Sequence, residues 1–140
     1  MIGAEGLRSS SWHWTWERNG APQFNRRIRK FSKDNPSSED WATWTAVKLI
    51  VQAAINSRSV LSCDLRSTMR SQDFAVDIYK VGPGSFRSWD QQLRQPILLH
   101  THNAVIGTAP FDGFLHCFNT FDTLGYDESE KRCSLENRPQ

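Results

Sequence analysis

The sequence predicts an α/β fold. Apolar residues recur at intervals of three and four over residues 22–56, which is the spacing of helices. From residue 74 to residue 81 they alternate at period two, which is typical of a strand. A length of 140 residues suits one domain, and its eight Phe and six Trp side chains predict a core of aromatic rings.

An extended segment is expected over residues 5–16, where three tryptophans stand at alternate positions in the stretch SSSWHWTWERNG. In a strand, the three indoles lie on one face and the residues between them on the other: Trp12, Trp14 and Trp16 against His13, Thr15 and Glu17. The indole face admits three interpretations: the floor of a core, a stacking platform for a ligand, or a surface for a partner domain.

The first helix is expected over residues 22–33. It follows a break at Asn19–Gln23, and Pro22 suits the first turn of a helix. Its apolar side comprises Phe24, Ile28 and Phe31. The basic run RRIRK at residues 26–30 then faces outward. We interpret this run as a solvated helix face rather than a phosphate-binding patch, because no recognised nucleic-acid-binding motif accompanies it.

The second helix is expected over residues 38–56, where Ser37 and Asp40 have the spacing of a capping box. Apart from one narrow polar stripe the helix is apolar nearly all round, whereas a helix covered on one side needs an apolar arc of only about 100°. We therefore expect it to be enclosed on nearly all sides within a larger α/β body, with Trp41 and Trp44 in the core. The polar stripe comprises Thr45, Lys48, Gln52 and Asn56.

Shorter elements are expected further along the chain. A third helix is predicted over residues 62–71, and a strand over residues 74–81 that ends at the GPG of residues 82–84. Residues 97–101 and 104–108 flank the dipeptide HN and predict a β-hairpin.

Residues with candidate chemistry are sparse. His100 and His102 lie two apart on one strand, where two imidazoles can share a metal ion, and His116 and Cys117 follow. We favour the interpretation that the first two histidines are exposed at the hairpin tip, so no metal site is expected. The sequence has no GxSxG motif and no dinucleotide-binding glycine loop. No catalytic residue and no cofactor is therefore predicted, and a binding protein is favoured over an enzyme.

Composition and patterning exclude further classes. The net charge of +2 is too small to indicate nucleic-acid binding, and no run approaches the ~18 consecutive apolar residues of a membrane span. Cys63, Cys117 and Cys133 lack the CxxC spacing of zinc and redox motifs. The N-terminal segment lacks the pattern of a signal peptide, which predicts a cytoplasmic location for the chain as it stands.

Several stretches together resemble one family: GAEGLRSSSWHWTWERNGAPQFNRRIRKFS, DWATWTAVKLIVQAA, DFAVDIYKVGPGSFRSWDQQLRQPILL and GFLHCFNTFDTLGYDESEKRC. From Gly3 to Cys133 the chain resembles the C-terminal portion of ABC-transporter substrate-binding proteins associated with pyrroloquinoline-quinone-dependent alcohol oxidation. That group is similar to the branched-chain amino acid binding proteins, which are type I periplasmic binding proteins. The long strings SFRxWDxQLRQPxLL and NTxDTLGYD make the resemblance specific.

The resemblance implies helices packed on a mainly parallel sheet, with a β-hairpin in the C-terminal part. Residues 1–133 would be a portion of the second of two lobes, and residues 134–140 a polar tail. Family members are longer, begin with an export signal and close two lobes over a ligand. The chain is therefore expected to be truncated or split, and one lobe alone is not expected to bind a solute tightly.

The function implied by the resemblance is solute capture for an ABC importer, without chemistry, in the periplasm and with a permease as partner. The exposed lobe surface would favour self-association. The alternatives are an accessory or sensory protein of quinone-dependent alcohol oxidation, and a non-functional remnant. Ligands of open α/β sheets bind beyond the carboxyl ends of strands, so we expect a cleft where the chain leaves its first strand. The candidate ligand-binding residues there are Trp12, His13, Trp14, Trp16 and Glu17.

Overall fold

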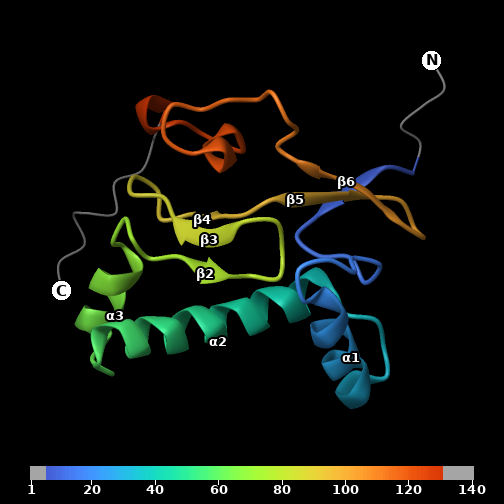
Figure 1. The fold of residues 1–140 in the computed structure, drawn as a ribbon, viewed down its shortest axis with the longest axis horizontal. Helices are drawn as coiled ribbons and strands as arrows, with labels where there is room; N and C mark the ends of the chain where they lie inside the picture. The colour runs from blue at the N-terminus through green and yellow to red at the C-terminus, as the bar shows by residue number, and fades with distance from the viewer. Residues whose placement is uncertain (1–5, 131–140) are drawn as a thin grey trace.

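The computed structural model describes residues 6–130, which form three α-helices and two small β-sheets (Figure 1). Residues 1–5 and 131–140 lie outside the described part, and with them the predicted polar tail of residues 134–140. The elements in chain order are β1 (Arg8–Ser10), α1 (Ala21–Ser32), α2 (Ser38–Ser57), α3 (Ser62–Met69), β2 (Val76–Asp77), β3 (Pro83–Phe86), β4 (Leu93–Arg94), β5 (Ile97–His100), β6 (Val105–Ala109) and the 3-10 turns η1 (Thr120–Thr123) and η2 (Glu128–Glu130).

Both sheets are antiparallel, so the prediction of a mainly parallel sheet is wrong. One sheet has the order β1-β5-β6 and the other the order β2-β3-β4. The connections explain the difference, since a parallel pair needs a crossover of about a dozen or more residues, usually a helix. Here α1, α2 and α3 all lie between β1 and β2 in the chain, and β2 to β6 follow one another through short turns.

The predicted β-hairpin is confirmed. β5 and β6 pair antiparallel, with Leu98 opposite Thr108 and His100 opposite Val105. β1 pairs with the other edge of β5, where Ser10 lies opposite Leu98. The hairpin therefore forms one sheet together with the N-terminal strand.

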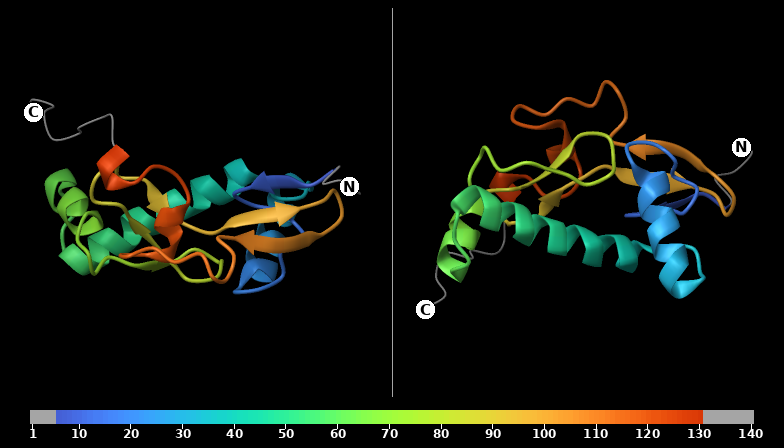
Figure 2. Two further views of the ribbon diagram at one scale, coloured as in Figure 1. Left: turned by 90° about the horizontal axis from the view of Figure 1, so that it is seen from above. Right: turned by 60° about the horizontal axis from the view of Figure 1, so that its bottom comes forward.

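The three predicted helices are confirmed, each with ends within two residues of the prediction. The capping box of α2 is present: the Asp40 amide donates to Ser37 Oγ at 3.2 Å, and the Ser37 amide donates to Asp40 Oδ2 at 2.8 Å. α2 runs along one side of the strands, with α1 at its N-terminal end and α3 at its C-terminal end (Figures 1 and 2). Local sequence signals were therefore sufficient to locate these elements.

Only one side of α2 is covered within the described residues, in contrast to the predicted enclosure on nearly all sides. The buried side comprises Trp41, Thr45, Leu49 and Ala53. On the opposite side, four apolar side chains are more than half exposed: Val47, Ile50, Val51 and Ile55. The predicted polar stripe lies partly on the covered side, because Thr45 is buried and Lys48 Nζ bonds Asp77 Oδ2 at 3.3 Å.

Aromatic rings form one of two core clusters, as the composition predicts. Trp12 and Trp41 stack with ring centroids 6.1 Å apart, and Phe24 meets Trp12 edge-on at 5.1 Å. Trp41 is buried, and its Nε1 donates to Ile78 O at 2.9 Å. Trp44, which was also predicted for the core, is only half-buried at the margin of this cluster. The second cluster comprises Leu49, Ala53, Phe74 and Val76.

The predicted strand through the tryptophans is wrong, because β1 ends before the first of them and residues 12–16 adopt an irregular path with a turn. The Trp16 amide donates to His13 O at 2.9 Å. Asn25 Nδ2 on α1 donates to Trp14 O at 2.9 Å and to Trp16 O at 3.2 Å. The Asn25 side chain thus occupies backbone carbonyl groups that would otherwise pair with a neighbouring strand. Residues 12–16 therefore do not continue the sheet.

The segment of residues 74–81 alternates as predicted but forms little sheet. Only Val76–Asp77 pairs with β3. Burial nevertheless follows period two along the segment, and the buried residues are Phe74, Val76, Ile78 and Lys80. The alternation therefore places a lysine at an inward position.

Lys80 is 2% exposed, and within residues 6–130 no carboxylate pairs with it. Its Nζ donates to Gln95 Oε1 at 2.5 Å and to Pro96 O at 3.1 Å. The same nitrogen lies 3.7 Å from the centre of the Trp41 ring. Burial disfavours the charged ammonium and lowers the pKa of Lys80 to about 7.

Stability is expected to rise with pH above 7 because of Lys80. The unfolded chain keeps this lysine protonated up to its ordinary pKa of 10.5, whereas the folded chain releases the proton above about 7. Between pH 7 and about 8.5 the free energy of unfolding should therefore increase by about 1–2 kcal/mol. Urea unfolding at several pH values, followed by circular dichroism, measures this. Lys80→Met cannot titrate, so an equal rise in that variant would contradict the assignment.

A buried ion network holds the C-terminal part of the chain on the hairpin of β3 and β4. Asp122 Oδ1 accepts from Arg87 Nε at 3.0 Å and from Arg94 Nε at 2.7 Å. Asp122 Oδ2 accepts from Arg94 Nη2 at 2.9 Å. Beside this network, Trp89 Nε1 donates to Tyr126 O at 3.2 Å. The network therefore attaches η1 to the hairpin.

Candidate functional site

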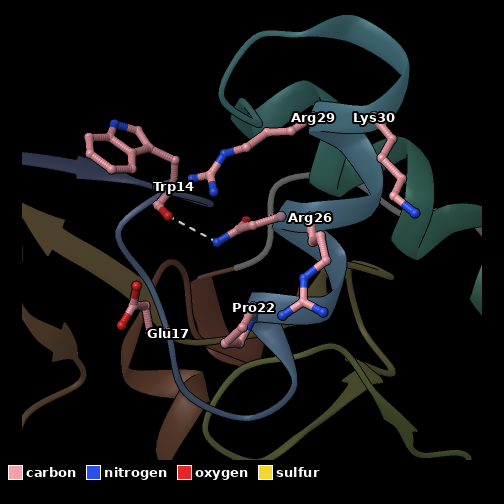
Figure 3. Close-up of a pocket in the computed structure, with 7 residues that line it drawn as sticks. Trp14, Glu17, Pro22, Arg26, Arg29 and Lys30 are labelled. Carbon is pink, nitrogen blue, oxygen red and sulfur yellow. Dashed lines mark hydrogen bonds between the residues drawn. The ribbon is translucent and has the colours of Figure 1, made fainter.

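A surface pocket lies between residues 12–17 and α1 (Figure 3). Its volume of about 420 Å³ falls within the range of small-molecule sites. The lining residues are Trp14, Glu17, Pro22, Asn25, Arg26, Arg29 and Lys30. The pocket thus combines an aromatic ring with charged groups of both signs.

Asn25 joins the two walls of the pocket. Its side chain is buried, where Oδ1 accepts from Trp12 Nε1 at 3.1 Å and Nδ2 donates to the carbonyls of Trp14 and Trp16. The bond to Trp14 is the dashed line in Figure 3. Because one side chain on α1 holds three points of the neighbouring segment, Asn25 is a positioning residue for Trp14 and Glu17.

The turn into α1 requires glycine at residue 20. Gly20 has a φ of 82°, which L side chains rarely adopt, and a Cβ there would lie 3.0 Å from Tyr79 Cδ1. Pro22 follows at the start of α1, where its missing amide hydrogen is not needed. This turn brings the Arg-bearing face of α1 back against the segment that carries Trp14.

Cationic side chains dominate the pocket. In Figure 3, Arg29 reaches from α1 toward Trp14, whereas Lys30 points away from it. The Arg29 guanidinium lies 5.9 Å from the centre of the Trp14 ring, and its Nε donates to Asn35 Oδ1 at 3.0 Å. In the part of the chain that the structure describes, Arg26, Arg29 and Lys30 make no ion pair. The site can therefore offer guanidinium N–H groups to an anion such as a carboxylate.

Two of the five predicted ligand-binding residues line this pocket. Trp14 is half-buried beside Arg29, and Glu17 is exposed at the edge. Trp12 and Trp16 do not line this pocket but belong to the aromatic cluster, with 2% and 6% of their surfaces exposed, and Trp16 lines a separate, smaller pocket. The indoles thus belong to two different surroundings, the core and the pocket wall.

His13, the remaining predicted residue, stacks on His100 with ring centroids 4.2 Å apart. His13 Nδ1 lies 2.8 Å from Thr15 Oγ1, and His100 Nδ1 lies 2.9 Å from Thr101 O. Partial burial, and then the positive charges that His100 and His102 can carry, lower the pKa of His13. Between residues 6 and 130, no group of three or more His, Cys, Asp or Glu side chains is placed to hold a metal ion.

Two further pockets of similar volume lie near the C-terminal part, both lined by Trp89. One of them is also lined by His116 and Cys117. His116 Nε2 lies 2.8 Å from Asp127 Oδ1, and Cys117 is an exposed free thiol. Neither pocket contains any of the predicted ligand-binding residues.

Sequence reasoning missed Asn25 and the contribution of α1 to the pocket. The run RRIRK predicts a solvated helix face, and its residues Arg26, Arg29 and Lys30 are indeed exposed, yet they also line the pocket. The available signal was the spacing of these three residues, which places them on one side of a helix that directly follows the aromatic segment.

No protein-family model matches the sequence, and no curated protein matches it at a significant level. Among solved structures, the fold is similar to part of a periplasmic binding protein. The particular structure is a periplasmic binding protein from Burkholderia mallei, with a TM-score of 0.70 and 18% sequence identity. The alignment covers 93% of this chain and 34% of that protein, so the chain spans about a third of its length. At this identity the similarity concerns the fold.

None of the helices in the described ranges is long and apolar enough to cross a bilayer.

Proposed function

We propose that the chain is a solute-binding protein that takes a small organic anion into the pocket between residues 12–17 and α1. The observation that carries the proposal is the Arg29 guanidinium, which lies 5.9 Å from the centre of the Trp14 ring in a pocket that Arg26 also lines. A guanidinium donates two parallel hydrogen bonds to a carboxylate, and the indole offers an apolar surface to the rest of the solute. Glu17 at the edge of the pocket disfavours solutes with several negative charges.

The similarity to part of a periplasmic binding protein supports a binding role in coarse outline. From the sequence resemblance, we further propose the substrate-binding component of an ABC importer, located in the periplasm and serving a permease. The same resemblance links the proposal to quinone-dependent alcohol oxidation. Two successive two-electron oxidations convert a primary alcohol, by way of the aldehyde, into a carboxylic acid, which is the ligand class that the cationic pocket favours. The proposed role is binding without chemistry, so the chain is not proposed to be an enzyme.

Calorimetric titration with short-chain carboxylates, and with alcohols of the same chain length, tests this function. We expect carboxylates to bind with a Kd of about 1 mM, because the charged lining residues are exposed and water weakens their interaction with the anion. The alcohols should bind at least about tenfold more weakly, since they lack the charge that a guanidinium pairs with.

Arg29→Gln is the variant that tests the assignment of the pocket, and it should weaken carboxylate binding about tenfold. Arg27→Gln is the matched control, because Arg27 is also on α1 but its guanidinium lies 6.0 Å from the Trp44 ring and not in the pocket. Equal losses in the two variants, or equal affinity for acid and alcohol, would contradict the proposed function.

A further inference from the structure

The outer face of α2 is an apolar stripe that the function proposed above does not use. We define it by four residues separated by intervals of four, three and four: Thr43, Val47, Ile50 and Ala54. Ala46, Val51 and Ile55 flank the stripe. Intervals of three and four are those by which two helices pack side by side at a shallow angle. The side of α2 that carries the stripe lies opposite its buried side.

Among the described residues, most of this face has neither a cover nor a charge. In Figure 1, α1 extends past the N-terminal end of α2 on the side that points away from the sheets, and no described helix or strand lies beneath the rest of that side. Between Asp40 and Arg58 the sequence of α2 contains one charged residue, Lys48. Lys48 does not charge the outer face, because its Nζ bonds Asp77 Oδ2 on β2 at 3.3 Å. Contiguous exposed apolar surface of this kind is typical of an interaction site.

We propose that the outer face of α2 packs antiparallel against the same face of a second copy of this chain. A two-fold axis between Val47 and Ile50 places Val47 of one copy against Ile50 of the other. The same axis places Thr43 against Ala54, because both lie four residues outside the central pair. The stripe is thus complementary to itself, and its small outer residues allow the two helices to approach closely.

Charges at the two ends of α2 select this arrangement over a parallel one. Glu39 lies one turn before Thr43, and Arg58 lies one turn after Ala54. Both side chains are exposed, and within residues 6–130 neither makes an ion pair. The antiparallel pair brings Glu39 of each copy to Arg58 of the other. A parallel pair would bring like charges together at both ends, and would also align the two helix dipoles unfavourably.

Sedimentation velocity of the full chain over about a hundredfold range of concentration tests the interface. We expect a monomer–dimer equilibrium, and Val47→Glu should abolish the dimer because it buries two carboxylates beside the axis. Ile106→Glu is the control, since Ile106 is 67% exposed on β6, away from the stripe. Circular dichroism establishes that both variants are folded. A folded wild-type chain that stays monomeric, or a dimer that Ile106→Glu disrupts and Val47→Glu does not, would overturn the proposal.

A charge exchange tests the direction of the two helices. Glu39→Arg and Arg58→Glu should each weaken the dimer, because each places like charges together at both ends. The double variant Glu39→Arg/Arg58→Glu restores opposite charges and should recover the wild-type Kd. If the double variant loses as much dimerisation free energy as the two single variants together, the helices do not pair antiparallel in this register. The readout is self-association, so it is independent of solute binding and of the proposed function.

Discussion

Asp122→Asn is expected to destabilise the fold by about 3–5 kcal/mol, the cost of removing one partner from a buried ion pair. Asp122 is 1% exposed and accepts three hydrogen bonds from Arg87 and Arg94. The amide keeps the shape of the carboxylate but removes its charge. The Arg87 guanidinium, which is 2% exposed, would then keep its charge with only the carboxylate of Asp90, at 3.4 Å, nearby.

Urea unfolding followed by circular dichroism measures the effect of Asp122→Asn on the free energy of unfolding. Asp112→Asn serves as the control, because Asp112 is exposed and makes no ion pair in the described ranges. The Asp122 variant should also become sensitive to limited proteolysis near η1, since the network attaches this segment to the hairpin of β3 and β4. A loss below about 1 kcal/mol, typical of a surface pair, would contradict the buried network.

Trp41→Ala is expected to cost about 3–5 kcal/mol, as is usual for a fully buried indole. The Trp41 ring stacks on Trp12 with an interplanar angle of 7°, and its Nε1 donates to Ile78 O at 2.9 Å. Lys80 Nζ lies 3.7 Å from the ring centre, so the same ring also packs against the buried lysine. Truncation would leave a cavity among these three residues and remove the aromatic contact of Lys80.

Trp44→Ala is the matched comparison and should cost less, about 1–2 kcal/mol, because its ring is only half-buried. The sequence alone predicts a loss of about 3–5 kcal/mol for Trp44 if its indole is fully buried. Thermal or urea unfolding of the two variants side by side separates the two expectations. Equal losses would mean that Trp44 is as deeply buried as Trp41, in conflict with the structure.

The two strings that carry the family resemblance contact each other in the fold. Arg87 and Arg94 belong to SFRSWDQQLRQPILL, and Asp122 belongs to NTFDTLGYD. Trp89 and Tyr126 extend the same junction through the hydrogen bond from the indole to the carbonyl. These strings are therefore architectural, which explains why the resemblance implies an architecture and no ligand contact.

The sequence by itself determined the helices and the hairpin of β5 and β6. A helix is held by hydrogen bonds between residues four apart, and its start at Ser37 by a partner three residues away, so the required information is local. The hairpin is also local, because its turn joins the two strands that pair. The alternating burial of residues 74–80 is likewise set by local sequence, because successive side chains of an extended segment point to opposite sides.

Tertiary structure decided what depends on residues far apart in the chain. Trp41 is buried and Trp44 is only half-buried because of the side on which α2 faces the strands. That side includes Thr45, which the sequence pattern assigned to a polar stripe. The path of residues 12–16 follows from Asn25, whose side chain competes with a strand for the same carbonyl groups. The antiparallel direction of the strands and the formation of the pocket also depend on contacts between residues far apart in the chain. Distant partners of this kind leave no regular spacing in a single sequence, and only the folded chain shows which of them meet.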